Sequence, residues 1–235
     1  MELTASMAIS GMVCMAVAGA YRGMVERGVD AKCKMNLHVL ASSAIAYAYE
    51  NDGEFPWAMD GYGECWDFKT AGATYEPGLL YEYTESSSIL MCPKCAGQKD
   101  NWAGGGFTGY NYNTSYAGKC RGDRAERTTP SGIDDFPSLE HLALFGDAGY
   151  GDPERMNKFM RAPKSDKEYD GSGSAVRKGG TQSFRHLGHA NIAFADGHVE
   201  SIRQSYRQDG SKGFVSDHTG FIDSGNGLYS GLLRE

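Results

Sequence analysis

Four cysteines follow residue 53, and their spacing allows two kinds of chemistry. Cys92 and Cys95 form a C-x2-C pair, which Cys65 and Cys120 could complete as a four-thiolate zinc site. If this part of the chain lies outside the cytoplasm, we expect the same cysteines to form disulfides, in preference to zinc binding or free thiols. No histidine immediately follows the C-x2-C pair, so the sequence offers no motif for covalent haem attachment.

A second group of side chains with metal-binding potential surrounds an Asp-Gly turn. His186, His189 and His198 lie near Asp196 in the sequence, and imidazole and carboxylate groups at strand ends can converge on an ion. The simpler interpretation, which we prefer, is that these groups make hydrogen bonds that fix the turn. His186 and His198 are therefore only weak candidates for metal ligands.

The sequence lacks the short motifs of common enzymes and of nucleic-acid-binding proteins. It contains no nucleophile elbow, phosphate-binding loop or dinucleotide fingerprint. The formal net charge is −7, and no basic stripe is present that could neutralise phosphates. We therefore expect neither an enzyme nor a nucleic-acid partner.

The element that must position these groups is a long helix at the start of the chain. The sequence is uncharged from Leu3 to Tyr21, a run that would be about 28 Å long as a helix, close to the thickness of a bilayer core. Apolar residues then recur at spacings of three and four (Val25, Val29, Cys33, Leu37, Leu40, Ala44 and Tyr47). The pattern predicts a helix over residues 1–52, with a membrane or filament-core half (1–21) and an amphipathic half (22–52) that lies on the rest of the protein.

The composition of the uncharged run indicates how it is used. It is rich in Ala, Gly, Ser and Met, and poor in Leu and Ile. Small residues let helix backbones approach closely, so this composition favours helix–helix packing over simple lipid anchoring. We interpret Cys14 in this run, and Cys33 on the amphipathic face, as packing residues.

Residues 53–235 are predicted to form one β-rich head domain. Strands are expected near residues 86–92, 107–116 and 141–146, and a long surface loop is expected at 163–183. The clearest local signal is a pair of apolar runs, 191–195 and 198–202, separated by Asp196-Gly197. This pattern predicts a β-hairpin with a type I′ turn.

Several short motifs together resemble one family. His186, nine residues and then Asp196-Gly197 match the H-x9-DG signature of bacterial prepilin-like proteins related to type II secretion pseudopilins. Other segments resemble the same family in the same order along the chain: a Cys-x-x-Asn-Leu at 33–37, a Gly-x-Phe-Pro at 53–56, a Cys-Pro at 92–93 and a Gly-Tyr-Asn at 109–111.

The resemblance implies a fold and a function. The fold would be α+β and type IV pilin-like, with a long N-terminal helix packed on a small antiparallel sheet with long loops. The function would be that of a structural subunit that polymerises through its N-terminal helix into a pilus-like extracellular filament. The implied partners are copies of the same chain, the inner membrane before assembly, a prepilin peptidase and the assembly machinery, and the implied location is the cell surface.

The resemblance also implies roles for particular residues. Self-assembly would involve the helix residues Glu2, Leu3, Met7, Gly11, Cys14 and Val17, with Glu2 in place of the family's glutamate at the fifth mature position. Some pseudopilins hold calcium in an acidic C-terminal loop, which makes Asp209, Asp217 and Asp223 weak candidates for metal ligands. Calcium and zinc are thus the two cofactors considered, and neither is firmly indicated.

Two other functions remain open from the sequence. The chain would be a membrane-tethered module if its head bound a ligand or a metal and never polymerised. It would be a minor pseudopilin if it primed a type II secretion pseudopilus without forming its bulk. The sequence does not distinguish a major from a minor subunit, and it does not identify what the filament contacts.

Overall fold

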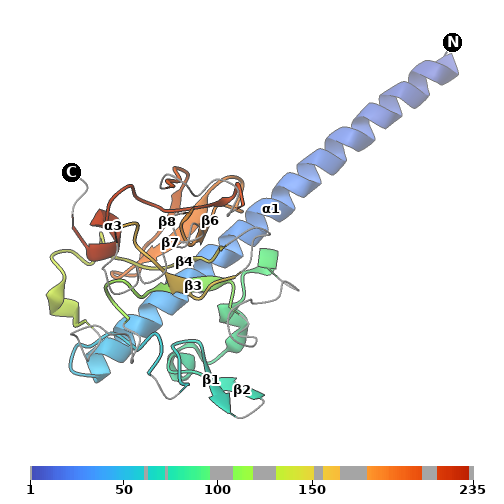
Figure 1. Ribbon diagram of the computed structural model, residues 1–235. Helices are drawn as coiled ribbons and strands as arrows, with labels where there is room; N and C mark the ends of the chain where they lie inside the picture. Colours follow the sequence, from blue (N-terminus) through green and yellow to red (C-terminus); the bar gives the residue numbers. More distant parts are fainter. Residues whose placement is uncertain are drawn as a thin grey trace.

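A single long helix and a small β-rich head make up the protein. The computed structural model describes residues 2–60, 63–71, 74–95, 108–118, 131–150, 156–164, 179–207 and 216–232. Helix α1 (Glu2–Glu50) runs without interruption along one face of the head and extends well beyond it (Figure 1). Its 49 residues correspond to a length of about 74 Å. The described part of the chain is therefore α+β, as predicted.

The head is built on a five-stranded sheet with the strand order β5-β3-β4-β7-β8. The strands are β3 (Tyr110–Asn113), β4 (Ala143–Asp147), β5 (Phe159–Met160), β7 (Ala190–Phe194) and β8 (Val199–Ile202). Neighbours pair antiparallel except β3 and β5, which are parallel. Two separate antiparallel pairs flank this sheet, β1 (Phe68–Ala71) with β2 (Thr74–Pro77) and β6 (Gln182–Ser183) with β9 (Thr219–Gly220).

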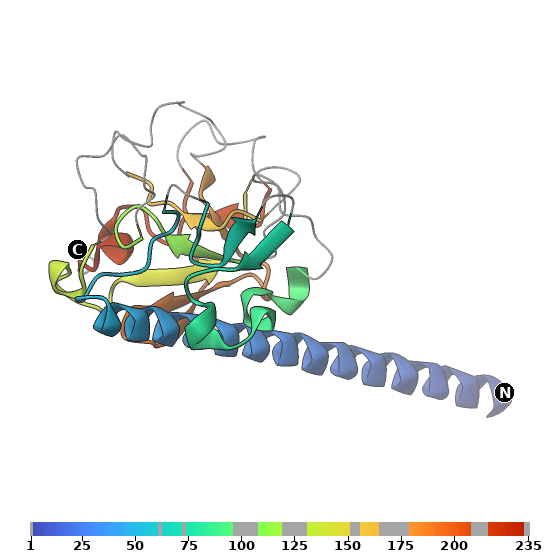
Figure 2. The ribbon, with the colours of Figure 1, turned by 90° about the horizontal axis from the view of Figure 1, so that it is seen from below.

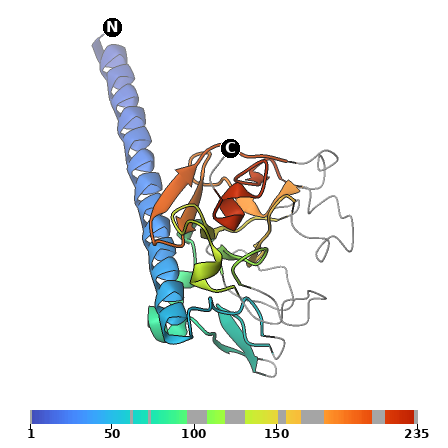
Figure 3. The same ribbon diagram turned by 90° about the vertical axis from the view of Figure 1, so that its left-hand side faces the viewer.

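Short helices lie in the segments that connect the other elements of the head. They are α2 (Tyr81–Thr84), η1 (Ser87–Leu90), η2 (Pro93–Cys95), η3 (Ile133–Asp135) and α3 (Gly227–Ser230). Seen from below, α1 lies along one face of the sheet (Figure 2). The side view confirms that the N-terminal part of α1 stands clear of every other element that is drawn as a ribbon (Figure 3).

The amphipathic half of α1 packs on the head as its periodicity predicts. The fully buried residues of this half are Cys33, Leu37, Leu40, Ala41, Ala44 and Ala48, and all belong to the main core of the head. The buried face begins further along than predicted, since Val25 remains 45% exposed. Burial of each leucine stabilises the fold by about 1.5–3 kcal/mol, so this face holds the helix against the sheet.

Aromatic side chains form the centre of the main core. Trp66, Tyr112 and Phe145 are fully buried and contact one another, with ring centroids between 4.7 and 5.9 Å apart. The hydroxyl of Tyr112 donates a hydrogen bond to the backbone oxygen of Pro56 at 3.0 Å. The loop that follows α1 is therefore tied to the sheet.

The predicted strand near residues 86–92 is wrong. This segment forms the 3-10 helix η1, and Ser86 caps it by accepting a hydrogen bond from the Ser88 backbone N–H at 3.3 Å. Serine favours such capped turns because its hydroxyl competes for backbone hydrogen bonds. The predicted strands within 107–116 and 141–146 are confirmed as β3 and β4.

The predicted hairpin is confirmed, but its predicted turn type is wrong. Strands β7 and β8 pair antiparallel, but with Ala193 opposite Val199, a register shifted by one residue from that of a two-residue Asp196-Gly197 turn. A type I′ turn needs positive φ at both central residues, whereas here Gly197 has a φ of +93° and Asp196 is not among the residues with positive φ. The Gly197 N–H bonds to the Phe194 oxygen at 2.9 Å, and the Phe194 N–H bonds to the His198 oxygen at 2.9 Å. The connection is therefore a type I turn followed by a left-handed glycine.

Residues 1–21 are predicted to enter a membrane before assembly. Within the described residues, no helix combines the length and the apolar character needed to cross a membrane.

Candidate functional site

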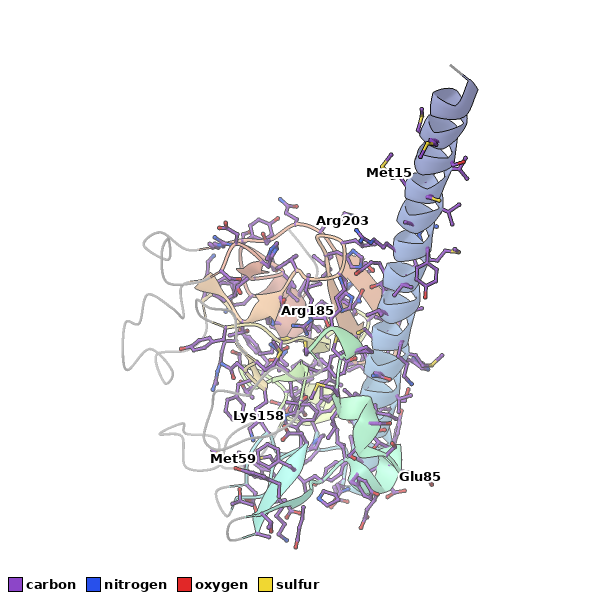
Figure 4. The ribbon with its side chains drawn as sticks, turned by 90° about the vertical axis from the view of Figure 1, so that its right-hand side faces the viewer. Met15, Met59, Glu85, Lys158, Arg185 and Arg203 are labelled. Carbon is purple, nitrogen blue, oxygen red and sulfur yellow. The ribbon has the colours of Figure 1, made fainter. Side chains whose placement is uncertain are left out.

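The first candidate site is the protruding half of α1, which we define as residues 2–25. Most of the large apolar side chains that the described residues expose lie here: Met7, Met12, Val13, Met15, Val17, Tyr21, Met24 and Val25. Met7 is 69% and Met15 is 70% exposed, and Figure 4 shows Met15 far from the head. With a rotation of 100° per residue, these positions are distributed around the whole helix. Its apolar surface is therefore not confined to one face.

The predicted self-assembly residues all lie in this half. Met7, Gly11, Cys14 and Val17 are exposed. Glu2 and Leu3 belong to the first turn of the helix, and their side chains lie outside the described ones. A Cβ atom added at Gly11, Gly19 or Gly23 would meet no atom within 4 Å. Contacts within the chain therefore do not require glycine at these positions.

The second candidate site is a buried cluster of thiol, imidazole and carboxylate groups between α1 and the head. We call it the thiol–imidazole cluster, and its members are Cys33, Cys92, Cys95, Asp147 and His186. The candidate ligand atoms of all members except Cys95 lie within 4.8 Å of one another. The thiol of Cys95 makes a side-chain hydrogen bond with Cys92. All five residues are at most 1% exposed, so the cluster has no contact with solvent.

Distances within the cluster show which atoms face each other. The Sγ atoms of Cys33 and Cys92 are 2.8 Å apart. The Nε2 atom of His186 lies 3.4 Å from Cys92 Sγ and 3.4 Å from an oxygen of Asp147. The Nδ1 atom of His186 faces the opposite way, 3.7 Å from an oxygen of Asp30 on α1.

Polar groups around the cluster hold two carboxylates in place. Asp147 Oδ1 accepts a hydrogen bond from Arg185 at 3.2 Å, and Asp147 Oδ2 accepts one from the Asn191 backbone at 2.8 Å. Arg185 also donates to the backbone oxygens of Ala148 and Gly109, and Figure 4 shows it inside the head. Burial raises the pKa of Asp30, but hydrogen bonds from Asn191, Lys34 and His189 outweigh it and lower that pKa to about 2.

The surroundings shift the pKa values of the cluster members in different directions. Hydrogen bonds from the other two thiols lower the pKa of Cys92, against the effect of burial, and His186 and Arg185 lower it further. The pKa values of Cys33 and Cys95 are raised, first by their hydrogen bonds with Cys92 and then by burial. For His186, burial lowers the pKa but Asp147 and Cys92 raise it to about 9. Without a metal, the cluster thus favours a thiolate at Cys92 beside a protonated imidazole.

The cysteine grouping predicted from the sequence differs from the observed one. The prediction joins Cys65 and Cys120 to Cys92 and Cys95, with Cys33 as a packing residue. The structure places Cys65 elsewhere, with its sulfur 3.1 Å from Lys158 Nζ, while Cys120 lies outside the described residues. No disulfide joins the cysteines in the described ranges. Cys33 and Asp147 are the cluster members that sequence reasoning missed.

The histidines near the Asp-Gly turn do not converge on one ion. His186 lies in the cluster, while His198 is at the hairpin turn, where its Nδ1 is 2.6 Å from Asp196 Oδ1. Its ring also stacks on Phe194, with centroids 4.5 Å apart. Asp196, Gly197 and His198 therefore fix the turn, which agrees with the simpler interpretation. His189 faces Asp30 at 3.0 Å.

The acidic C-terminal residues do not form a calcium site in the described part of the chain. Asp223 accepts hydrogen bonds from the backbones of Gly225 and Leu228 and so holds the start of α3. Asp217 is fully exposed and lies 3.8 Å from Arg207, and Asp209 lies outside the described residues. Of the residues that the structure describes, only the thiol–imidazole cluster brings together three or more potential metal ligands.

Segments that carry the family resemblance meet at the cluster. Cys33 comes from the Cys-x-x-Asn-Leu segment, Cys92 from the Cys-Pro segment and His186 from the H-x9-DG signature. Asn36, from the same segment as Cys33, also connects α1 to the head. Its side chain donates hydrogen bonds to the Met91 backbone and the Tyr110 hydroxyl, both at 3.2 Å.

The chain matches no protein-family model, no curated protein and no solved structure. The resemblance to prepilin-like proteins therefore stays a prediction based on short motifs. The coarse α+β architecture rests on the structure alone.

Proposed function

We propose that this chain is a structural subunit that polymerises through the protruding half of α1 into a pilus-like filament. The observation that carries the proposal is the set of large apolar side chains that surround this half and remain between 45% and 70% exposed. Leaving them in water is unfavourable by about 25 cal/mol for each Å² of apolar surface. Packing against other helices on all sides removes that cost.

The partner most compatible with this surface is the same helix of other copies. A helix that is apolar all round is suited to a bundle core, whereas binding to one groove needs only one apolar face. Small residues allow close backbone approach, and the protruding glycines are not needed for intrachain packing. Copies related by a rotation and a rise build an open helical polymer. The type IV pilin-like fold and the surface location belong to the same proposal.

The test combines microscopy with variants of two glycines. Filaments sheared from cells would be examined by negative-stain electron microscopy and identified by mass spectrometry. Gly11→Leu and Gly19→Leu should abolish filaments because leucine keeps the helices apart. Leucine has a higher helix propensity than glycine by nearly 1 kcal/mol, so the loss cannot be due to a weaker helix.

A matched control is Gly225→Ala in the head, where an added Cβ also meets no atom within 4 Å. This variant should form filaments normally. Wild-type protein found only as monomers would contradict the proposal and favour a tethered module.

A further inference from the structure

We propose that Cys33, Cys92, Cys95 and His186 bind one zinc ion, with Asp147 held beside the ion and not bonded to it. The site lies within a single chain, so it is independent of whether the chain polymerises. Its four ligands come from three segments that are far apart in the sequence: α1, the segment 92–95 that includes η2, and the segment before β7.

The distances in the cluster approach those of tetrahedral coordination. Zinc bonds of about 2.3 Å to sulfur and 2.0–2.1 Å to nitrogen place neighbouring ligand atoms roughly 3.5–3.8 Å apart. The separation of 3.4 Å between His186 Nε2 and Cys92 Sγ is already close to this value. The two sulfurs of Cys33 and Cys92, which lie 2.8 Å apart, would have to move about 1 Å further from each other to bind one ion.

Cys95 fits the fourth position better than Asp147 does. Both oxygens of Asp147 already accept hydrogen bonds, from Arg185 and from the Asn191 backbone. Cys95 lies at the end of η2 and its backbone N–H bonds to the Cys92 oxygen at 2.8 Å, so the C-x2-C pair is closed into one turn. Such pairs commonly supply two thiolates to one structural zinc ion.

The imidazole of His186 has the orientation that zinc ligands usually have. Its Nε2 faces the thiols, and its Nδ1 is turned toward the carboxylate of Asp30, whose oxygen at 3.7 Å lies just beyond hydrogen-bond distance. A carboxylate behind a metal-binding histidine fixes the ring orientation and increases the basicity of the ligand nitrogen. Asp30 is in turn held by Lys34 at 2.9 Å and by Asn191 at 2.8 Å.

Burial defines the kind of site. Catalytic zinc keeps one position for water or substrate, whereas structural zinc is closed by four protein ligands. The four proposed ligands are between 0 and 1% exposed. The ion would therefore act as a structural cross-link that fastens α1 to the head.

The first experiment measures the metal directly in the full-length protein. Protein purified without chelators, with zinc supplied in the growth medium, should contain one zinc per chain by mass spectrometry of the metal. X-ray absorption at the zinc edge should show three sulfur neighbours and one nitrogen neighbour. Replacement by Co²⁺ should give the visible bands of a tetrahedral thiolate site.

Variants then test the choice of ligands. Cys95→Ser should lower zinc affinity at least tenfold and reduce the sulfur count, whereas Asp147→Asn should leave three sulfurs on the metal. Cys65→Ser is the matched control, because Cys65 is also buried but lies outside the cluster, and it should retain full zinc content.

Three outcomes would overturn the proposal. They are a Cys33–Cys92 disulfide in the protein as isolated, a zinc-supplied protein without stoichiometric metal, and an absorption spectrum with only two sulfur neighbours. The wild-type spectrum decides the ligand set even if a cysteine variant fails to fold.

Discussion

The sulfur atoms of Cys33 and Cys92 face each other at 2.8 Å although the two residues are 59 positions apart in the sequence. Cys33 lies on α1, and Cys92 lies in the head just before η2. The helix is therefore joined to the rest of the protein by this contact as well as by its buried apolar face. Polar contacts from the same helix segment, including Asn36 with Tyr110, surround it.

Removal of a leucine from the buried face of α1 should destabilise the whole protein. Leu40 is fully buried in the main core, so Leu40→Ala should lower the free energy of unfolding by about 2–5 kcal/mol. Met35 lies on the same helix but is 58% exposed, and Met35→Ala should change it by no more than about 0.5 kcal/mol. Chemical denaturation followed by circular dichroism measures both. Equal effects of the two changes would show that α1 is not held by this face.

The hairpin turn should depend on glycine at position 197. Gly197 has a φ of +93°, and an added Cβ would meet only ordinary contacts with Ser42 and His38. Gly197→Ala should therefore cost about 1–2 kcal/mol through backbone strain alone. Gly197→Asn should cost less, because asparagine tolerates the left-handed conformation. Gly225→Ala is the control, and thermal denaturation of the three variants compares them.

Tyr83 should lose its proton at unusually high pH. Its hydroxyl donates to Glu50 at 2.7 Å, and burial, followed by this hydrogen bond and the charge of Glu50, raises its pKa to about 12. The neutral tyrosine is thus favoured in the folded state. The stabilisation that comes from this raised pKa is complete below pH 10, and it is lost as the pH rises toward 12. NMR titration of the tyrosine ring carbons measures the pKa.

The dependence of the Tyr83 pKa on the Glu50 carboxylate can be tested by a pair of substitutions. Glu50→Gln should bring the Tyr83 pKa closer to 10, although burial keeps it above that value. Glu85→Gln is the control because Glu85 is not among the main causes of the shift, and it should leave the titration nearly unchanged. A Tyr83 pKa near 10 in the wild-type protein would contradict the role assigned to Glu50.

Cys14 offers a chemical readout of assembly. It lies on the protruding half and is exposed, whereas Cys33, Cys65, Cys92 and Cys95 are buried. A thiol reagent should therefore modify Cys14 rapidly in monomers and at least tenfold more slowly in filaments, where neighbouring helices would cover it. Peptide mapping after brief labelling measures the rate. Equal rates in filaments and monomers would place Cys14 outside the filament core.

The helix, the hairpin and the central strands could be predicted from the sequence because each leaves a local pattern. The spacing of Leu37, Leu40 and Ala44 identifies a buried helix face, and two apolar runs around Asp196-Gly197 identify a hairpin. The turn type was missed because it depends on which residues pair across the loop, and the sequence alone did not give that register. Ser86, a capping residue, was the signal that could have identified η1.

The thiol–imidazole cluster could be predicted only in part. The C-x2-C pair and His186 stand out in the sequence, but Cys33 resembles any small apolar residue on a helix face. Asp147 ends a fully buried strand, where no spacing rule indicates a role. Their convergence depends on how α1 lies across the sheet, which is a property of the tertiary structure.

The continuous course of α1 has a mechanical consequence. A pulling force on the protruding half reaches the main core of the head at the first fully buried residue of the helix, which is Cys33. Without a cross-link there, tension would peel the helix from the sheet one turn at a time, with each turn loaded alone. If the proposed zinc ion fastened the helix at this edge, the helix would have to shear past the sheet along its whole buried length. Shear would load all of its contacts together, so the head would bear a larger force before it detached.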